Sequence, residues 1–234
     1  SIVPPATCGD NILKTTFAKS GCCGNPDKAF DLKHTDLRIQ NDISFDVNPS
    51  YDPELAAYGP YAVGRKYMTV AHDSEIMLVY PSVSHATSDP AHASVRCSAS
   101  EVMNVTLYGR SKVDAVMLGG SFPLILFVSG FPHEIHETLH HAENLASKGF
   151  VVAAVQINGA RLVDVFDISL FTNAPVQITR TLDDILADDS LHVNVTQVGA
   201  VGYSVGGNLL HNLADDRIKA RVLISPYGIL GSAA

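Results

Sequence analysis

The sequence predicts an α/β protein, built on a mostly parallel sheet with helices on both faces, and three observations lead to this prediction. Apolar runs of strand length alternate with amphipathic segments of helix length from residue 122 onward. Hydrophobic residues make up 46% of the chain and charged residues only 17%, which excludes general disorder and a coiled coil. The 234 residues also suffice for one large domain with a real core.

The chain divides into two stretches of different character. Residues 1–57 are polar, poorly periodic and interrupted by turn formers such as Gly24-Asn-Pro26, so we expect an irregular N-terminal extension. Residues 58–234 are expected to form the α/β domain. Its first elements are two strands, Arg65–Val70 and Glu75–Tyr80, which a short turn joins into an antiparallel hairpin. Residues 82–104 resemble a loop or insertion.

Strands and helices alternate strictly after residue 121. Phe122–Val128 is a continuous apolar run, as expected for a strand buried on both faces. Ile135, Leu139 and Ala142 mark one face of a helix that ends at Lys148-Gly149. The later elements are a strand at Phe150–Ile157, a helix marked by Ile178, Leu182 and Ile185 and preceded by Pro175, a strand at Gln197–Tyr203, a helix at Val205–Ala214 and a strand at Ala220–Ser225. This order predicts parallel strands.

Charge and hydropathy exclude two classes of partner. Sixteen lysines and arginines stand against 24 acidic residues, for a net charge of −8, and no basic run occurs. Nucleic-acid binding needs clustered cations, so we expect no nucleic-acid partner. The longest apolar stretches, such as Gly149–Ile157, fall far short of the ~20 residues that a membrane span needs.

The cysteines and the first residue favour a secreted or organelle-lumen location, the chloroplast included. Four cysteines lie in the N-terminal half, and their pairing cannot be derived from their spacing. They match no zinc pattern, and we expect neither a metal nor a cofactor. Asn104-Val-Thr and Asn194-Val-Thr are acceptor sequences for N-glycosylation. Residue 1 is serine rather than methionine, which suggests processing.

The most specific motif is Gly202-Tyr-Ser-Val-Gly206, at a predicted strand-to-helix turn. Such a turn strains the central residue and leaves no room for a Cβ two residues to either side, which explains both glycines. It presents the Ser204 hydroxyl above the N-terminus of the next helix, with the Val205 N–H directed at a developing oxyanion. Ser204 is therefore the predicted nucleophile.

A second oxyanion donor is expected in Ser129-Gly-Phe-Pro132, the loop after the first buried strand. Gly130 allows the chain to turn close to the nucleophile, and the Phe131 N–H can point inward. The alternative is an ordinary turn. The position directly after the buried strand favours the functional interpretation.

These segments resemble the α/β-hydrolases, in particular the group of chlorophyllases, platelet-activating-factor acetylhydrolases and cutinase-like polyester hydrolases. Tyr58–Val63 and Leu78–Pro81 are similar to that group's opening, and Ser129 departs from the histidine that many members have there. The resemblance covers residues 58 to about 230. It implies a serine esterase acting on small-molecule or lipid-like esters through an acyl-enzyme, with Ser204 as nucleophile and the Phe131 and Val205 N–H groups as the oxyanion hole.

The base and acid of such a site are not found near Ser204 in the sequence. In this fold they follow the nucleophile in the order serine, carboxylate, histidine. The later candidates are His211, Asp215 and Asp216. His211 lies about 10 Å along the helix that follows Ser204, too far to act as base. We expect an incomplete hydrolase domain without its last strands, in a longer polypeptide. The alternatives are a partner protein that covers the open sheet edge, or a catalytically inactive subunit of an assembly.

A competing motif lies within His133-Glu-Ile-His-Glu-Thr-Leu-His-His141, where His136, Glu137 and His140 match H-E-x-x-H. On a helix this pattern can bind zinc, with the glutamate as base of a metalloprotease. The extended pattern asks for glycine and histidine further on, where the chain has Glu143 and Ala146. The apolar face of this helix is also expected to pack on the sheet. We therefore favour a solvated or loop-packing role for these histidines.

Overall fold

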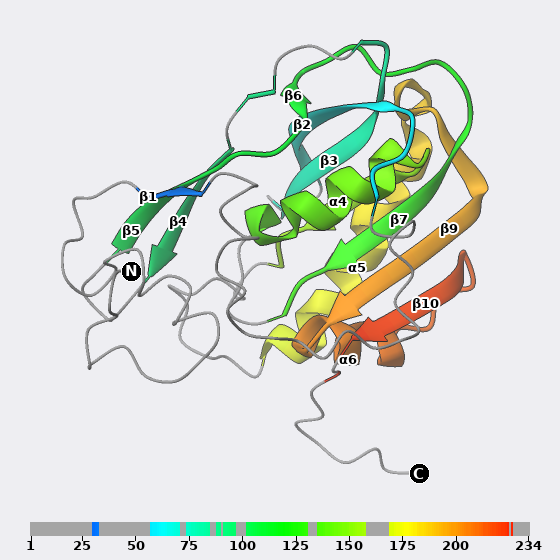
Figure 1. Cartoon of the computed structure of the whole chain (residues 1–234). Helices are drawn as coiled ribbons and strands as arrows, with labels where there is room; N and C mark the ends of the chain where they lie inside the picture. The colour runs from blue at the N-terminus through cyan, green and yellow to red at the C-terminus, as the bar shows by residue number, and fades with distance from the viewer. Residues whose placement is uncertain are drawn as a thin grey trace, which may run out of the picture. The chain divides into compact units, whose positions relative to one another are not determined.

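The computed structural model describes residues 30–32, 57–70, 74–84, 88–89, 91–96, 102–130, 135–157, 169–224 and 226. Contacts divide the chain into two compact units (Figure 1). One contains residues 1–49 and 90–109, and the other contains residues 50–89 and 110–234. The domain boundary predicted at residue 57 remains a prediction. The contacts also group residues 90–109 with the N-terminal residues, which the sequence did not indicate.

The smaller unit contains a three-stranded sheet in the order β1-β5-β4. Its strands are β1 (Phe30–Leu32), β4 (Ala91–Arg96) and β5 (Val102–Leu107), with β5 parallel to β1 and antiparallel to β4. The loop or insertion expected over residues 82–104 therefore includes strand β4 and the start of β5. Small and polar residues alternate in β4, so it lacks the apolar signal of a buried strand.

The larger unit is built on a seven-stranded sheet in the order β10-β9-β7-β8-β3-β2-β6. The strands are β2 (Ala62–Val70), β3 (Ser74–Ser82), β6 (Lys112–Val113), β7 (Phe122–Val128), β8 (Val151–Val155), β9 (Val193–Tyr203) and β10 (Ile218–Ile224). Strands β10, β9, β7 and β8 are mutually parallel, and β2 and β3 form the expected antiparallel hairpin. The predicted mostly parallel sheet is confirmed.

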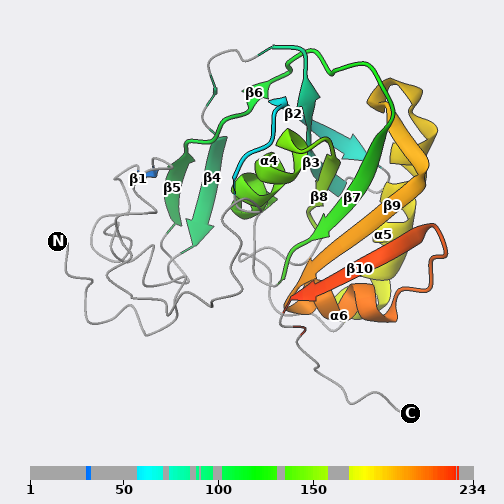
Figure 2. The ribbon, with the colours of Figure 1, turned by 45° about the vertical axis from the view of Figure 1, so that its right-hand side comes forward.

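Helices lie on both faces of this sheet, as predicted. The short 3₁₀ helix η2 (Ile135–Thr138) leads into α4 (Leu139–Ser147), which packs on β3 and β8. Helices α5 (Ser169–Ala187) and α6 (Val205–Asn212) cover the opposite face (Figures 1 and 2). Another short 3₁₀ helix, η3 (Asp189–Leu191), precedes β9. No helix in the described ranges is long and apolar enough to cross a bilayer.

Helix α5 begins earlier than the sequence predicted. Pro175 was expected to precede the helix, but the helix starts at Ser169 and contains this proline. A proline removes one backbone hydrogen bond and disfavours a helix interior. The apolar face downstream of Pro175 is deeply buried and stabilises the helix as a whole through its packing on the sheet.

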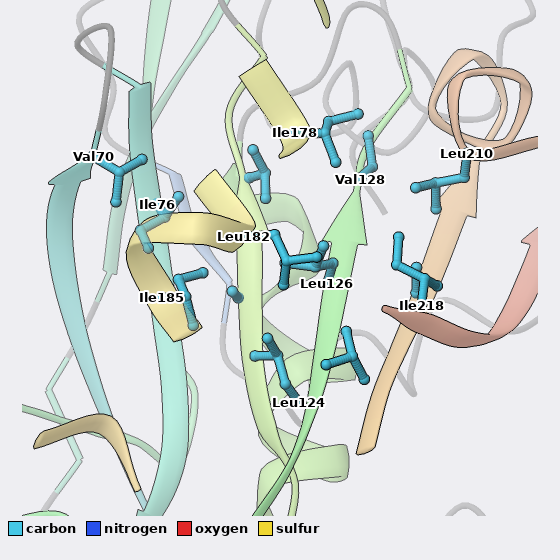
Figure 3. Packing of buried hydrophobic residues seen from close by; sticks show 14 of the residues in the cluster. Val70, Ile76, Leu124, Leu126, Val128, Ile178, Leu182, Ile185, Leu210 and Ile218 are labelled. Atoms are coloured by element: carbon cyan, nitrogen blue, oxygen red, sulfur yellow. The ribbon is translucent and has the colours of Figure 1, made fainter. Parts of the chain in front are cut away.

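The core lies between the sheet and helices α5 and α6. Figure 3 shows side chains of both helices meeting those of β7 and its neighbours. Ile178, Leu182 and Ile185 recur at helical spacing and are at most 1% exposed. In Figure 3, Ile178 lies near Val128 and Leu182 near Leu126, both fully buried residues of β7, whereas Ile185 lies near Ile76 of β3. Each such side chain contributes about 1.5–3 kcal/mol on burial.

A buried polar network fixes α4 to the segment before β6. Glu143 of α4 is fully buried, and its Oε1 accepts hydrogen bonds from Arg110 N at 2.8 Å, Ser111 N at 2.8 Å and Ser111 Oγ at 2.6 Å. The fully buried Arg65 of β2 donates from Nη1 to Ser111 O at 2.9 Å and Ser111 Oγ at 2.8 Å. The Ser111 hydroxyl thus links a buried cation to a buried carboxylate.

Candidate active site

The glycine-flanked motif lies at the junction of β9 and α6, with Ser204 as the single residue between them. Ser204 has φ 53° and ψ −119°, in the half of conformational space that residues with a Cβ rarely adopt. A non-glycine residue is held there only when the surrounding structure compensates for the strain. The predicted strand–turn–helix context is therefore present around Ser204.

Steric clearance explains both glycines of the motif. A Cβ at Gly202 would lie 2.6 Å from the carbonyl oxygen of Gly206. A Cβ at Gly206 would overlap the carbonyl oxygen of Val128, at the end of β7. The bend is consequently too tight for any side chain at either position.

Hydrogen bonds and strand register hold this bend from both sides. Ser204 N donates to Ile224 O at 2.9 Å, which ties the bend to the end of β10. Gly202 lies opposite Val128 of β7 in the parallel register. Asn208 N donates to Ser204 O at 3.2 Å and begins the hydrogen bonding of α6. Ser204 itself is half-buried, so its position is fixed while part of the residue is accessible.

The Val205 N–H belongs to the first residue of α6. The first N–H groups of a helix have no partner within the helix and carry partial positive charge. The Val205 side chain is 6% exposed and packs into the core, which fixes the backbone at this point. The arrangement can stabilise negative charge that develops beside Ser204.

The loop after β7 is described only in part. Ser129 and the buried Gly130 directly follow the strand end that lies opposite Gly202. Phe131, predicted as the second oxyanion donor, lies outside the described residues. Its role remains a prediction.

Within the described ranges, no histidine or carboxylate is hydrogen-bonded to the Ser204 side chain. His211 is exposed in the last turn of α6, and Asp216 is also exposed. Asp215 is engaged by Arg217, whose Nε and Nη2 donate to the carboxylate at 2.9 and 2.7 Å. These hydrogen bonds from Arg217 hold the pKa of Asp215 below its ordinary value. Asp215 is therefore an ionised partner of an arginine, not of a catalytic histidine.

The competing histidine motif does not lie on one regular helix. His136 falls in η2 and His140 in α4, while Glu137 lies between them. The His136 ring lies 5.5 Å from the Tyr67 ring, and His140 Nδ1 lies 3.9 Å from Glu143 Oε2. The described part of the chain contains no group of three side chains able to hold a metal ion. The solvated or loop-packing role expected for these histidines remains a prediction.

An open apolar groove lies on the sheet face away from α5 and α6. It has a volume of about 390 Å³ and is lined largely by residues of β7, β9 and β10, including Ile125, Val201 and Val222. Val222 is 54% exposed and Ile224 is 43% exposed. The sequence predicts an open sheet edge, because the expected domain lacks the last strands of its fold.

Comparison with known proteins identifies structural relatives only. No protein-family model matches the chain, and no curated protein is significantly similar in sequence. A ferulic acid esterase from Streptomyces cinnamoneus is similar, with a TM-score of 0.53 and 19% identity over 70% of this chain and 59% of that one. An alpha/beta hydrolase enzyme from a Medee basin deep-sea metagenome library has a TM-score of 0.40 and 16% sequence identity. That match covers 69% of this chain and 55% of the hydrolase chain.

The similarity to the ferulic acid esterase shows a shared fold and nothing more, because the sequence identity is only 19%. The chain spans 59% of the length of that esterase. The parallel strands β10-β9-β7-β8, the antiparallel pair β3-β2 and the helices on both faces correspond to the predicted architecture. This chain has the α/β-hydrolase fold.

Proposed function

We propose that the chain is the nucleophile-bearing part of a serine esterase that hydrolyses carboxylic esters through an acyl-enzyme. The observation that carries the proposal is the strained Ser204, with φ 53°, held between β9 and α6 by two glycines that admit no Cβ. Strain at a single, half-buried serine in this position is typical of a catalytic serine. A merely structural serine would not require it.

The proposed reaction has two halves. Ser204 Oγ loses its proton to a base and attacks the ester carbonyl carbon, and the alcohol leaves with a proton. Water then attacks the acyl-serine, which releases the carboxylic acid and restores the hydroxyl. The N–H groups of Val205 and Phe131 are the proposed donors to the oxyanion formed in each half, and loss of one such donor typically lowers kcat about 10²–10³-fold.

The proposal requires a histidine base and a carboxylate that orients it. Neither lies against Ser204 among the described residues, and Asp215 is occupied by Arg217. We propose that both come from segments outside the described residues. Because a base must activate the Ser204 hydroxyl, the reactivity of this hydroxyl tests whether such a base is present.

The proposed substrates are small-molecule or lipid-like esters. The resemblance of Tyr58–Val63 and Leu78–Pro81 to the chlorophyllase, platelet-activating-factor acetylhydrolase and cutinase-like group supports this class. The first of these segments docks on the end of α4, where Gly59 N donates to Ser147 Oγ at 2.8 Å and Tyr61 N donates to Ser147 O at 3.0 Å. Hydrolysis assays with chlorophyll, an acetylated phospholipid and a short aliphatic ester separate the three members of the group.

A fluorophosphonate probe tests the proposed nucleophile, since it reacts with a serine whose hydroxyl is activated by a base. We expect one adduct, on the peptide that contains Ser204, and none in Ser204→Ala. Ser190→Ala is the matched control, because Ser190 is exposed and bonded to Asp188, and it should leave labelling unchanged. If the complete native protein is folded and stays unlabelled at Ser204, the esterase proposal is contradicted.

The second candidate is a catalytically inactive hydrolase-fold subunit whose partner protein covers the open sheet edge. The exposed Val222 and Ile224 of β10 favour it, because this strand is the last of the sheet among the described residues, and exposed apolar residues at a sheet edge invite association. Both candidates keep the glycine-flanked bend. Only the inactive subunit predicts a correctly folded chain, verified by circular dichroism, whose Ser204 resists the probe when the complete native protein is used.

A further inference from the structure

Strand β9 contains a bulge close to its start. Phe122 and Pro123 of β7 pair with Val193 and Asn194, but the next residue, Leu124, pairs with Val198. Val195, Thr196 and Gln197 therefore have no counterpart on β7, and β10 begins its pairing with β9 only at Val198. A bulge of this kind leaves the ladder and directs its residues outward. Val195 is 54% exposed, and Thr196 and Gln197 are exposed as well.

The Asn194 side chain organises this bulge through three exposed hydrogen bonds. Its Oδ1 accepts from Thr196 N at 3.1 Å and from Thr196 Oγ1 at 2.8 Å. Its Nδ2 donates one hydrogen bond, to Gln197 Oε1 at 3.1 Å. An amide nitrogen carries two protons, so this contact uses only one of them.

These residues form the tripeptide asparagine, any residue but proline, and threonine, which is the acceptor sequence for N-linked glycans. We propose that Asn194 is a glycosylation site that carries an N-linked oligosaccharide. The substituted amide keeps one N–H, so the three hydrogen bonds of the bulge can persist after modification. The sugar then occupies the place of the proton that has no role in the bulge.

The transfer needs a lipid-linked oligosaccharide as co-substrate, of the polyprenyl pyrophosphate class. A bond forms between Asn194 Nδ2 and the anomeric carbon of the first sugar. The bond from that carbon to the pyrophosphate oxygen breaks, the lipid pyrophosphate leaves, and the amide nitrogen releases one proton. No oxidation or reduction takes place.

The place of the bulge in the fold suits a large exposed modification. Asn194 and Gly202 pair with Pro123 and Val128 of β7, which are five residues apart, so Asn194 and the bend at Ser204 are separated by roughly 20 Å at about 3.3 Å per residue. A glycan at Asn194 therefore leaves the bend at Ser204 free. The second acceptor sequence differs, because Asn104 lies inside β5, the central strand of its sheet, in register with Ser94 of β4.

Mass spectrometry of the native protein decides the proposal. The full-length protein, isolated from cells that make it, is treated with peptide N-glycosidase in heavy-oxygen water. We expect the peptide that contains position 194 to appear as aspartate carrying heavy oxygen. Recovery of that peptide as unmodified asparagine, before and after the enzyme, overturns the proposal.

Variants expressed through a secretory pathway locate the modification. Asn194→Gln and Thr196→Ala should each abolish the glycosidase-sensitive shift in electrophoretic mobility, whereas Thr196→Ser should retain it because the hydroxyl remains. Asn104→Gln is the matched control and should leave the shift unchanged. A shift that survives Asn194→Gln and disappears in Asn104→Gln overturns the assignment to Asn194. The peptide measurement on the unaltered protein is independent of how well any variant folds.

Discussion

The two halves of the large sheet differ in how their strands are covered. In β8, Val151–Val155 are at most 1% exposed, and Ile76–Tyr80 of β3 are at most 2% exposed. Helix α4 packs on one face of these strands and the core beneath α5 covers the other. In β10 only Ile218 is buried, while Val222 and Ile224 are 54% and 43% exposed. Figure 2 shows α6 beside β10, and α6 packs against this strand.

An apolar sequence alone therefore does not ensure that a strand is buried on both faces. Leu223 packs against the core on the α6 side, so its neighbours Val222 and Ile224 face the other way. These two side chains lie on the sheet face that α4 covers at β3 and β8, but α4 does not extend over β10, so they stay exposed. The covered half should therefore carry most of the folding free energy, and the open half should carry the capacity for association.

The largest expected effect concerns the buried network of the covered half. Glu143→Ala leaves Arg110 N, Ser111 N and Ser111 Oγ without their shared acceptor, in a fully buried position. We expect a loss of about 3–5 kcal/mol in the free energy of unfolding, measured by denaturant titration. Asp215→Ala is the counterpart in the open half, and we expect about 1 kcal/mol there because its partner Arg217 is 36% exposed. Equal losses of stability in Glu143→Ala and Asp215→Ala would contradict the proposed difference between the two halves of the sheet.

The sequence predicted the elements of the covered half because local patterns specify them. The apolar run at 122–128 is β7, and Lys148-Gly149 marks the end of α4, where Gly149 adopts φ 96°. The bend at Ser204 was also predictable, since two glycines at fixed spacing encode a steric requirement that stays within five residues. Val128 and Ile224 lie beside this bend because β7 and β10 are the two strands that flank β9 in the sheet.

Other features depend on distant partners and left no local signal. Glu143 was notable in the sequence only as a departure from a zinc-binding pattern, yet it is bonded to residues 32 and 33 positions away. Nothing in a helix sequence tells which of its carboxylates will be buried, because that depends on which segment packs against it. The bulge in β9 was missed for the same reason, since it exists only relative to the register of β7.

A matched pair of valines tests the burial difference directly. Val152 of β8 is fully buried and Val222 of β10 is 54% exposed. Val152→Ala removes two buried methyl groups and leaves a cavity, and we expect a loss of about 2 kcal/mol in the free energy of unfolding. For Val222→Ala we expect a change within about 0.5 kcal/mol. A large loss for Val222→Ala in the isolated chain would mean that another segment covers β10.

The smallest expected effect is a difference in how salt alters stability at low pH. Burial alone would raise the pKa of Glu143, but the neighbouring His140 and the hydrogen bonds from Ser111 and Arg110 outweigh burial and hold that pKa below its ordinary value of 4.5. The pKa of Asp215 is likewise held below 3.8, first by its hydrogen bond from Arg217. A lowered pKa stabilises the fold above the ordinary value, and this stabilisation disappears as the pH falls through the folded-state pKa. Both carboxylates should therefore contribute to acid unfolding.

Salt separates the two contributions because it screens exposed charges far more than buried ones. We expect Glu143→Gln to flatten the acid limb of the stability curve equally at low and high ionic strength. Asp215→Asn should flatten it at low ionic strength and much less at high ionic strength, since salt already weakens the partly exposed pair with Arg217. Urea titrations at several pH values and two salt concentrations measure both. If the Glu143 contribution also fell with added salt, water and ions would reach the network, and the covered half would be less sealed than its burial implies.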